Sequence, residues 1–169
     1  MVIPIDQYQE IKQKEFPNKK VVCTSGFFDP IHPGHISCLL ESKKFGEIFV
    51  VIVDGDQIAK TKKGKPFIPE KDRSEIVDAI KGVDYVVIYN HPTDYSVIGG
   101  LEIVRPDVFT KGGDRDPQNA EDPNSPLYKE LKFLESYGAT VEYGVGKDKV
   151  WSSSNYLQEW VDFVNSKKN

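Results

Sequence analysis

The chain has 169 residues, of which 38% are hydrophobic and 28% are charged, and its formal net charge is −4. This length suits one domain with a buried core, so we expect residues 1–169 to form a single domain. The mildly acidic balance argues against a nucleic-acid-binding surface, which normally carries an excess of basic residues. No apolar run approaches the length of a membrane span and the N-terminus lacks the regions of a signal peptide, so we expect a cytoplasmic protein that binds no membrane.

Strand-like and helix-like segments alternate along the chain. This alternation predicts an α/β fold, a Rossmann-like five-stranded parallel sheet with helices on both faces. The five strands are expected at about 20–25, 48–53, 83–88, 107–110 and 140–143. The second of these is continuously apolar, which is typical of a strand buried on both faces.

Helices are expected before, between and after these strands. Residues 1–19 are expected to hold a peripheral helix at 6–16, opened by a capping box of Asp6 and Gln9. Further helices are expected from the first glycine-rich loop to about 45, at 69–81 with Pro69 at the first position, at 94–104, from 126, and from 152–154 onward. The basic segment 60–65 is expected to be a loop. The last helix is expected to bury its apolar side chains, Leu157, Trp160, Val161 and Val164.

The stretch 112–126 is rich in Gly, Asp, Asn and Pro and has no hydrophobic periodicity. Loops of this length are uncommon inside a compact domain and are often functional, so we expect a lid or an insertion, with disorder as the alternative. The two cysteines, Cys23 and Cys38, lie among apolar neighbours without zinc-type spacing. We expect them to be small core residues, neither a disulfide nor metal ligands.

The most informative motif lies where the first strand meets the following helix. Gly26-Phe27-Phe28-Asp29 follows the strand, and His32-Pro33-Gly34-His35 opens the helix. A helix N-terminus binds anions because unpaired backbone N–H groups and the helix dipole point toward the ligand. Two histidines at that position add donors that can follow charge developing on a phosphate, and Gly34 lets the backbone come close to the ligand. A single histidine is more often structural, but the paired motif favours a phosphate site.

This motif resembles the signature of the HxGH nucleotidyltransferases, the cytidylyltransferase-like superfamily. Arg105-Pro106-Asp107 and Lys111-Gly112-Gly113-Asp114 are similar to the adenylyltransferase domain of ADP-heptose synthase in particular, and glycerol-3-phosphate cytidylyltransferase is a further similar family. The resemblance covers roughly residues 20–160. It does not include the N-terminal helix or the insertion 115–126, and the sugar-kinase half of the heptose enzyme has no counterpart here.

Groups that bind anions follow several strands of the predicted sheet. In an open parallel sheet, ligands bind beyond the carboxyl ends of the strands, where the strand order reverses. The histidine motif follows the first strand, Asp54 and Asp56 with a lysine cluster follow the second, and Lys111–Asp114 follows the fourth. A serine run, Ser152–Ser154, precedes the last helix. We therefore expect these segments to meet at one edge of the sheet.

The resemblance implies a role for each group. The catalytic set would hold the triphosphate and the departing pyrophosphate: His32, His35, Lys60, Lys62 and Lys63. The nucleotide-binding set would be Gly26, Phe27, Phe28, Asp29, Gly34, Lys111, Gly112, Gly113, Asp114, Ser152, Ser153 and Ser154. The substrate-binding set would be Asp54, Asp56 and Arg73. Each group also has an alternative interpretation. The lysines can form a solvated surface, the serines can be a helix N-cap, and Arg73 can be a surface charge. Asp29 can either orient a loop or bind the metal.

One departure from the relatives concerns a missing arginine. Glycerol-3-phosphate and ethanolamine-phosphate cytidylyltransferases place an arginine a few residues before the serine run, where this chain offers only Lys147 and Lys149. Mg²⁺ is expected as the cofactor, held mainly by phosphates and water, with no protein metal site.

The implied reaction transfers NMP from an NTP, with ATP favoured and CTP next, to a sugar or polyol phosphate, releasing pyrophosphate. A nicotinamide-mononucleotide or flavin adenylyltransferase is a rival enzyme, because Phe28-Asp29-Pro30-Ile31-His32 is similar to the nicotinamide type. A non-catalytic nucleotide-binding sensor is the rival from another class. The resemblance also implies a homodimer, and neither charge nor motif supports a nucleic-acid partner.

Overall fold

A computed structural model describes residues 1–94, 96–113, 121–123, 125–148, 150 and 152–167. Its strands form a six-stranded sheet in the order β1-β4-β3-β2-β5-β6, and each neighbouring pair is parallel. The strands are β1 Val2–Ile3, β2 Val21–Gly26, β3 Ile48–Asp54, β4 Tyr85–Tyr89, β5 Val108–Thr110 and β6 Thr140–Glu142. The predicted parallel α/β fold is confirmed, but the predicted number of five strands is wrong. The additional strand, β1, pairs with Val86 and Val87 of β4 and is too short to show a periodic pattern.

Seven α-helices and two short 3₁₀ helices in the described residues connect and flank these strands. The α-helices are α1 Tyr8–Glu15, α2 Pro33–Ser42, α3 Asp56–Lys63, α4 Glu70–Asp78, α5 Ile98–Val104, α6 Pro126–Glu135 and α7 Ser153–Ser166. The 3₁₀ helices are η1 Ile5–Gln7 and η2 Lys43–Phe45. None of the described helices is both long and apolar enough to cross a membrane.

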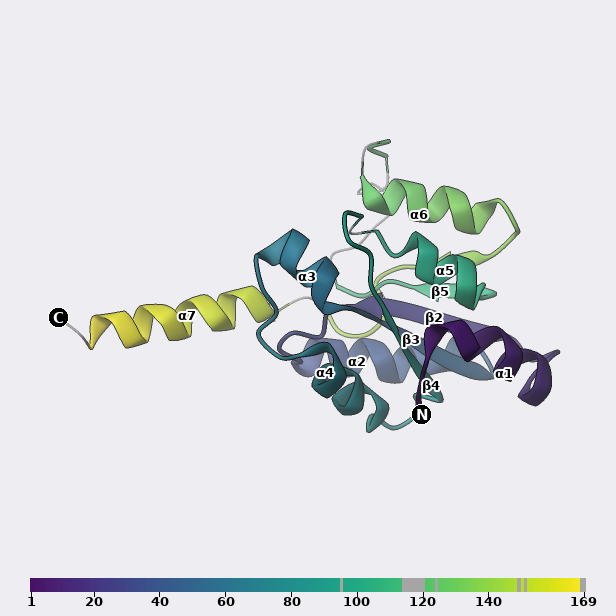
Figure 1. The fold of residues 1–169 in the computed structure, drawn as a ribbon, viewed down its shortest axis with the longest axis horizontal. Coiled ribbons are helices and arrows are strands. Elements are labelled where there is room, and N and C mark those ends of the chain that lie inside the picture. Colours follow the sequence, from purple (N-terminus) through teal and green to yellow (C-terminus); the bar gives the residue numbers. More distant parts are fainter. Residues whose placement is uncertain (95, 114–120, 124, 149, 151, 168–169) are drawn as a thin grey trace.

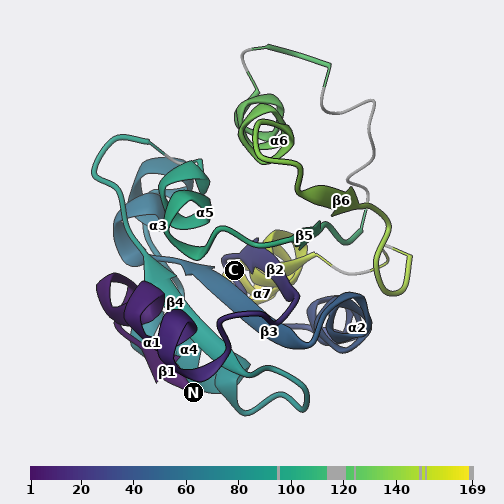
Figure 2. The same ribbon diagram turned by 90° about the vertical axis from the view of Figure 1, so that its right-hand side faces the viewer.

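The central strands are buried on both faces, as their continuous apolar sequence predicts. Along β3, Val50 and Ile52 pack with helices α1, α5 and α6, whereas Val51 and Val53 pack with helices α2 and α4. Side chains alternate between the faces of a strand, so each face needs its own apolar set. Helices therefore cover both faces of the sheet, with α5 and α6 on one side of the strands and α2 on the other (Figure 2).

Three local predictions were wrong. Most of the expected basic loop 60–65 is the end of helix α3, because Gln57, Ile58 and Ala59 extend a helical pattern into it. Pro69 is the N-cap of α4 and not its first residue. Neither η1 nor α1 has a side-chain cap, so the expected capping box of Asp6 and Gln9 does not form; instead the Gln9 side chain donates to the carbonyl of Ile103.

The last helix differs most from its prediction. Helix α7 projects away from the sheet and buries none of its residues (Figure 1). Of the four side chains expected in the core, Trp160 is 65% exposed and Val161 is 49% exposed. Val164 is also exposed, and Leu157 is partly buried. Helical periodicity correctly predicts an apolar face, but it does not say which surface that face contacts.

The strand order creates the position for a site. From β2 the chain moves outward to β3 and β4, and then crosses back to place β5 on the other side of β2. The order therefore reverses between β2 and β5. Ligands of open α/β sheets bind beyond the carboxyl ends of the strands at such a switch point.

Candidate active site

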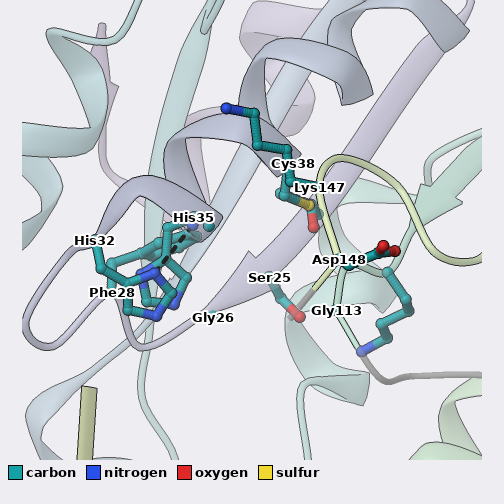
Figure 3. Close-up of a pocket in the computed structure, with 13 residues that line it drawn as sticks. Ser25, Gly26, Phe28, His32, His35, Cys38, Gly113, Lys147 and Asp148 are labelled. Carbon is teal, nitrogen blue, oxygen red and sulfur yellow. Dashed lines mark hydrogen bonds between the residues drawn. The ribbon is translucent and has the colours of Figure 1, made fainter. Parts of the chain in front are cut away.

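A cleft lies at the carboxyl ends of β2 and β5. It consists of two adjoining hollows of about 240 and 420 Å³ that share Ser25, Gly26, Phe28, His35 and Lys111. The first, which we call the α2 hollow, is completed by Thr24, His32, Gly34, Cys38, Gly112, Gly113, Lys147 and Asp148 (Figure 3). The second, the α3 hollow, is completed by Phe27, Asp29, Asp54, Lys62, Lys63, Val97, Ser125, Pro126, Leu127, Glu130 and Ser153. The expected meeting of separate segments at one sheet edge is thus present in the structure.

His32 and His35 stack on each other at the start of helix α2. Their ring centroids lie 3.7 Å apart with an angle of 15° between the planes (Figure 3). His32 is the N-cap of α2, and its Nδ1 accepts a hydrogen bond from the backbone N–H of His35 at 3.3 Å. An accepting Nδ1 carries no proton, so the neutral His32 ring has its proton on Nε2. The cap therefore sets both the position and the tautomer of His32.

Burial keeps both imidazoles neutral in the free protein. Desolvation lowers the pKa of His32, and it lowers the pKa of His35 to about 3, with the charges of His32 and Lys63 adding to the effect. The Nδ1 atom of His35 is buried without a hydrogen-bond partner among the described residues. An anion in the cleft would offset this desolvation, because a nearby negative charge favours the protonated imidazole. The pair is thus suited to respond to phosphate charge.

Asp29 orients a loop. Its carboxylate accepts hydrogen bonds from the backbone N–H groups of Phe67 and Ile68, at 2.9 and 2.8 Å. The side chain is almost fully buried. Of the two roles expected for Asp29, loop orientation is the one for which the structure provides contacts.

Arg73 is fully buried below the cleft. Its guanidinium donates to the carbonyls of Phe27, Asp54 and Ile68 and forms an ion pair with Asp56 at 2.9 Å. These four contacts tie the loop after β2 to the end of β3 and to the segment before α4. Neither Arg73 nor Asp56 lines a hollow, so the structure gives this pair a supporting position instead of the expected contact with substrate.

The lysine cluster lies on helix α3, at one wall of the α3 hollow. Lys62 and Lys63 line this hollow, and their ammonium groups lie 5.3 and 4.5 Å from the centre of the Phe27 ring. Partial desolvation lowers the pKa of Lys63. Lys60 belongs to the same helix but lines neither hollow. Two of the three predicted catalytic lysines therefore reach the cleft.

The segment after β5 packs closely against helix α2. A Cβ atom on Gly112 would lie 2.8 Å from the Cys38 Sγ and 3.1 Å from the Val145 carbonyl oxygen, so only glycine fits there. Gly113 has a φ of 70°, in the left-handed region. The fourth residue of the motif, Asp114, lies outside the described residues, as does Lys149. Lys147, the other expected substitute for the missing arginine, does line the α2 hollow.

Of the serine run, Ser153 lies at the cleft. Its Oγ donates to the Pro30 carbonyl oxygen at 2.8 Å, and it lines the α3 hollow. Ser152 is the N-cap of α7 and accepts from the Asn155 N–H at 3.4 Å. Ser154 is exposed and lines neither hollow. Within the serine run, Ser152 is thus the expected N-cap and Ser153 is the expected group at the cleft.

Two carboxylates flank Lys111 in the α3 hollow. Glu130 Oε2 forms an ion pair with Lys111 Nζ at 3.0 Å, and the two side chains are 8% and 11% exposed. Asp54, at the end of β3, lines the same hollow. Desolvation raises the pKa of Asp54 to about 6, and the charge of Lys111 opposes this rise. Sequence reasoning missed Glu130, because a glutamate on an amphipathic helix resembles a solvent-exposed residue.

The sequence analysis also missed several residues on the cleft wall. These are Thr24, Ser25, Val97, Ser125, Pro126, Leu127 and Asp148. Ser25 extends the predicted Gly26 motif by one residue. Ser125 and Pro126 belong to the predicted lid or insertion 112–126, and Leu127 directly follows it. Cys38, expected only in the core, is partly buried and lines the α2 hollow. Thr24 and Ser25 could have been predicted, because they lie at the carboxyl end of the first predicted strand, where ligands of such sheets bind.

The described residues contain no group of three or more His, Cys, Asp or Glu side chains placed to hold a metal ion. Mg²⁺ commonly binds through one or two carboxylates and the substrate phosphates, keeping several waters. Mg²⁺ delivered with a nucleoside triphosphate would be held mainly by the phosphate oxygens and water.

Residues 23–133 match the model of the cytidylyltransferase-like family. The chain belongs to this family. The matched region contains both histidines, helix α3 and the segment after β5. The predicted enzyme class, nucleotidyltransferase, is thereby confirmed.

The similar curated proteins are longer than this chain. The bifunctional protein HldE of a Nitratiruptor species is 36% identical over 119 residues, which cover 69% of this chain and 25% of that protein. HldE of Helicobacter pylori is 35% identical over 136 residues, covering 79% of this chain and 28% of that protein. The chain thus spans about a quarter of the length of these relatives.

Two solved structures support the fold. The lipopolysaccharide core biosynthesis protein of Thermoplasma volcanium has a TM-score of 0.57 and 28% identity, covering 77% of this chain and 98% of that chain. Pantoate-beta-alanine ligase of Francisella tularensis has a TM-score of 0.62 and 14% identity, covering 93% of this chain and 72% of that chain. At that identity, the second likeness concerns the fold alone.

Proposed function

We propose that this protein transfers a nucleoside monophosphate, AMP in preference to CMP, from the triphosphate to the phosphate group of a sugar or polyol phosphate. The observation that carries the proposal is the stacked histidine pair at the N-terminus of α2, located at the switch point of the sheet. The similarity to HldE proteins favours a sugar phosphate as the acceptor and ATP as the donor.

The two hollows differ in a way that suggests which substrate each one holds. Gly34, Gly112 and Gly113 line the α2 hollow and leave room for a flat base to approach the backbone. The α3 hollow contains Lys62, Lys63 and Asp54, which suit a phosphorylated, hydroxyl-bearing acceptor. The reacting phosphates would then lie over the shared floor, beside His35 and Lys111.

In the proposed reaction, an oxygen of the acceptor phosphate attacks the α-phosphorus of the triphosphate. A new P–O bond forms, the bond from the α-phosphorus to the oxygen bridging to the β-phosphate breaks, and pyrophosphate leaves with that electron pair. The attacking phosphate is already anionic near neutral pH, so no general base is needed. Catalysis would consist mainly of positioning and of stabilising charge on the phosphates.

Several residues in and around the cleft would each have a task in this reaction. His32 Nε2–H and the His35 ring would donate to phosphate oxygens at the helix N-terminus, where the dipole already favours negative charge. Lys62 and Lys63, on the wall of the α3 hollow, would hold the phosphate group of the acceptor. Mg²⁺ bound to the triphosphate supplies additional charge neutralisation. Asp29 and Arg73 keep the loops around the site in place.

Pyrophosphate release in the presence of Mg²⁺ tests this function. ATP and CTP should each be offered with sugar 1-phosphates, glycerol 3-phosphate, nicotinamide mononucleotide and FMN. We expect turnover with a sugar or polyol phosphate, and with ATP ahead of CTP. Turnover only with nicotinamide mononucleotide or FMN would identify the rival adenylyltransferase. Nucleotide binding without pyrophosphate release from any pair would contradict the proposal and favour a sensor.

A further inference from the structure

The Asp54 carboxylate lines the α3 hollow, whose wall carries several lysines. None of the described residues donates a hydrogen bond to it, although it lies beside Lys62, Lys63 and Lys111 along the wall of the α3 hollow. The Asp54 side chain is partly buried, so it loses part of its hydration without gaining a hydrogen bond from the described residues. A ligand that carries hydrogen-bond donors would replace this lost hydration.

A carboxylate here is also unfavourable for binding phosphate, because the two negative charges repel each other. Its presence beside three lysines therefore indicates a ligand that carries donors as well as phosphate. Hydroxyl groups are the donors that a sugar or polyol phosphate offers, and a carboxylate can accept several of them. The polar chemistry of the hollow thus matches a phosphate monoester with neighbouring hydroxyl groups.

Glu130 holds the intervening lysine in place. Its Oε2 pairs with Lys111, and its Oε1 accepts a hydrogen bond from the N–H of Val97, the N-cap of helix α5, at 3.2 Å. Both carboxylate oxygens are therefore used, and the side chain is almost fully buried. This arrangement fixes Lys111 in the wall of the α3 hollow, next to Asp54.

We propose that Asp54 determines acceptor specificity by accepting hydrogen bonds from acceptor hydroxyl groups, and that Glu130 is a positioning residue that orients Lys111 beside it. The acceptor class is a polyhydroxylated phosphate monoester. This inference rests on the proposed nucleotidyl transfer and adds to it the group that discriminates among phosphate monoesters.

The test compares acceptors that carry hydroxyl groups with analogues of similar shape that lack them. Glycerol 3-phosphate is paired with propyl phosphate, and glucose 1-phosphate with cyclohexyl phosphate, using ATP and Mg²⁺. We expect the wild-type protein to prefer the hydroxylated member of a pair by kcat/KM. Asp54→Ala should reduce that preference about ten- to a hundredfold, as loss of hydrogen bonds to a charged group implies, with the KM for ATP unchanged. Glu130→Gln should raise the acceptor KM and reduce the same preference, while kcat changes less.

Glu142→Gln is the matched control. Glu142 ends strand β6 at the same edge of the sheet but lines neither hollow, so this variant should keep the wild-type preference. An unchanged preference in Asp54→Ala, or an equal rise in the KM for ATP, would overturn the inference while the proposed function stands. Absence of turnover by the wild-type protein with every acceptor would overturn the proposed function, and this inference with it.

Discussion

Helices α2 and α7 both begin at the cleft with a side-chain cap, but they are supported differently. Helix α2 starts at His32 and buries Leu39 completely against the sheet. Helix α7 starts at Ser152 and buries none of its residues. The comparison shows that two helix N-termini can offer the same anion-binding groups while only one of them is held by the core.

The contacts of α7 with the site are few. Ser153 donates to the Pro30 carbonyl oxygen, and the ring of Tyr156 meets that of His32 edge-on at a centroid distance of 6.5 Å. An isolated helix of this length is marginally stable in water, because nucleation is costly and no tertiary packing compensates for it. We therefore expect changes at α2 to have large effects and changes at α7 to have small ones.

The largest effect is expected at the packed helix. His35→Ala should reduce kcat about 10²–10³-fold, because it removes one preorganised donor to the phosphates. The circular dichroism spectrum should stay native, since no described residue accepts or donates a hydrogen bond at the buried Nδ1 of His35. Pyrophosphate release measures the first quantity. A variant with wild-type turnover would remove His35 from the catalytic set.

The next largest difference is expected in the free energy of unfolding, when a core residue of α2 and an exposed residue of α7 are each replaced by alanine. Leu39→Ala should lower the free energy of unfolding by about 2–5 kcal/mol, because it leaves a cavity in the core. Trp160→Ala should change it by no more than about 0.5 kcal/mol, as expected for an exposed residue away from special contacts. Urea denaturation measures both. A loss of several kcal/mol in Trp160→Ala would mean that α7 packs against a surface in solution.

The pH dependence of the free energy of unfolding should include a contribution from His35 of α2. The pKa of His35 is held at about 3 in the folded protein, against an ordinary value of 6.5. Between these values the unfolded chain binds more protons than the native protein, so the free energy of unfolding should fall as the pH falls below 6.5. In His35→Ala this part of the slope should be absent. Equal slopes in urea titrations of both proteins from about pH 7 to about pH 4 would contradict the burial of a neutral His35.

The smallest effect is expected at the first turn of α7. Ser153→Ala removes the hydrogen bond to Pro30 at the α3 hollow and should raise the KM for the acceptor by about two- to tenfold, the range that one neutral hydrogen bond allows. Ser166→Ala, at the other end of the same helix, is the matched control and should leave the KM unchanged. If both variants behave alike, the Ser153 contact does not hold the helix at the site.

The sheet was predictable from the sequence because its signal is local. The run 48–53 is apolar throughout, and β3 is the observed strand there, buried on both faces. Strand β1 was missed because two residues carry no measurable period. The histidine motif was equally visible, since the spacing of His32 and His35 is itself the pattern that builds the pair.

What could not be predicted depends on contacts between distant segments. The apolar face of α7 shows a helical period whether or not a surface covers it, so its exposure was not foreseeable. Arg73 was recognised by position, but its burial depends on carbonyl groups from three other segments. Glu130 was missed because its partner, Lys111, is 19 positions away in sequence.

Detection of the product by mass spectrometry tests the central claim most directly. Wild-type protein and His35→Ala should be incubated with ATP or CTP, Mg²⁺ and a sugar 1-phosphate, and pyrophosphate should be measured in the same samples. The account predicts a nucleoside-diphosphate sugar formed in equal amounts with pyrophosphate by the wild-type protein, and about 10²–10³-fold more slowly by the variant. Pyrophosphate without a joined product, or equal rates in the two proteins, would contradict it.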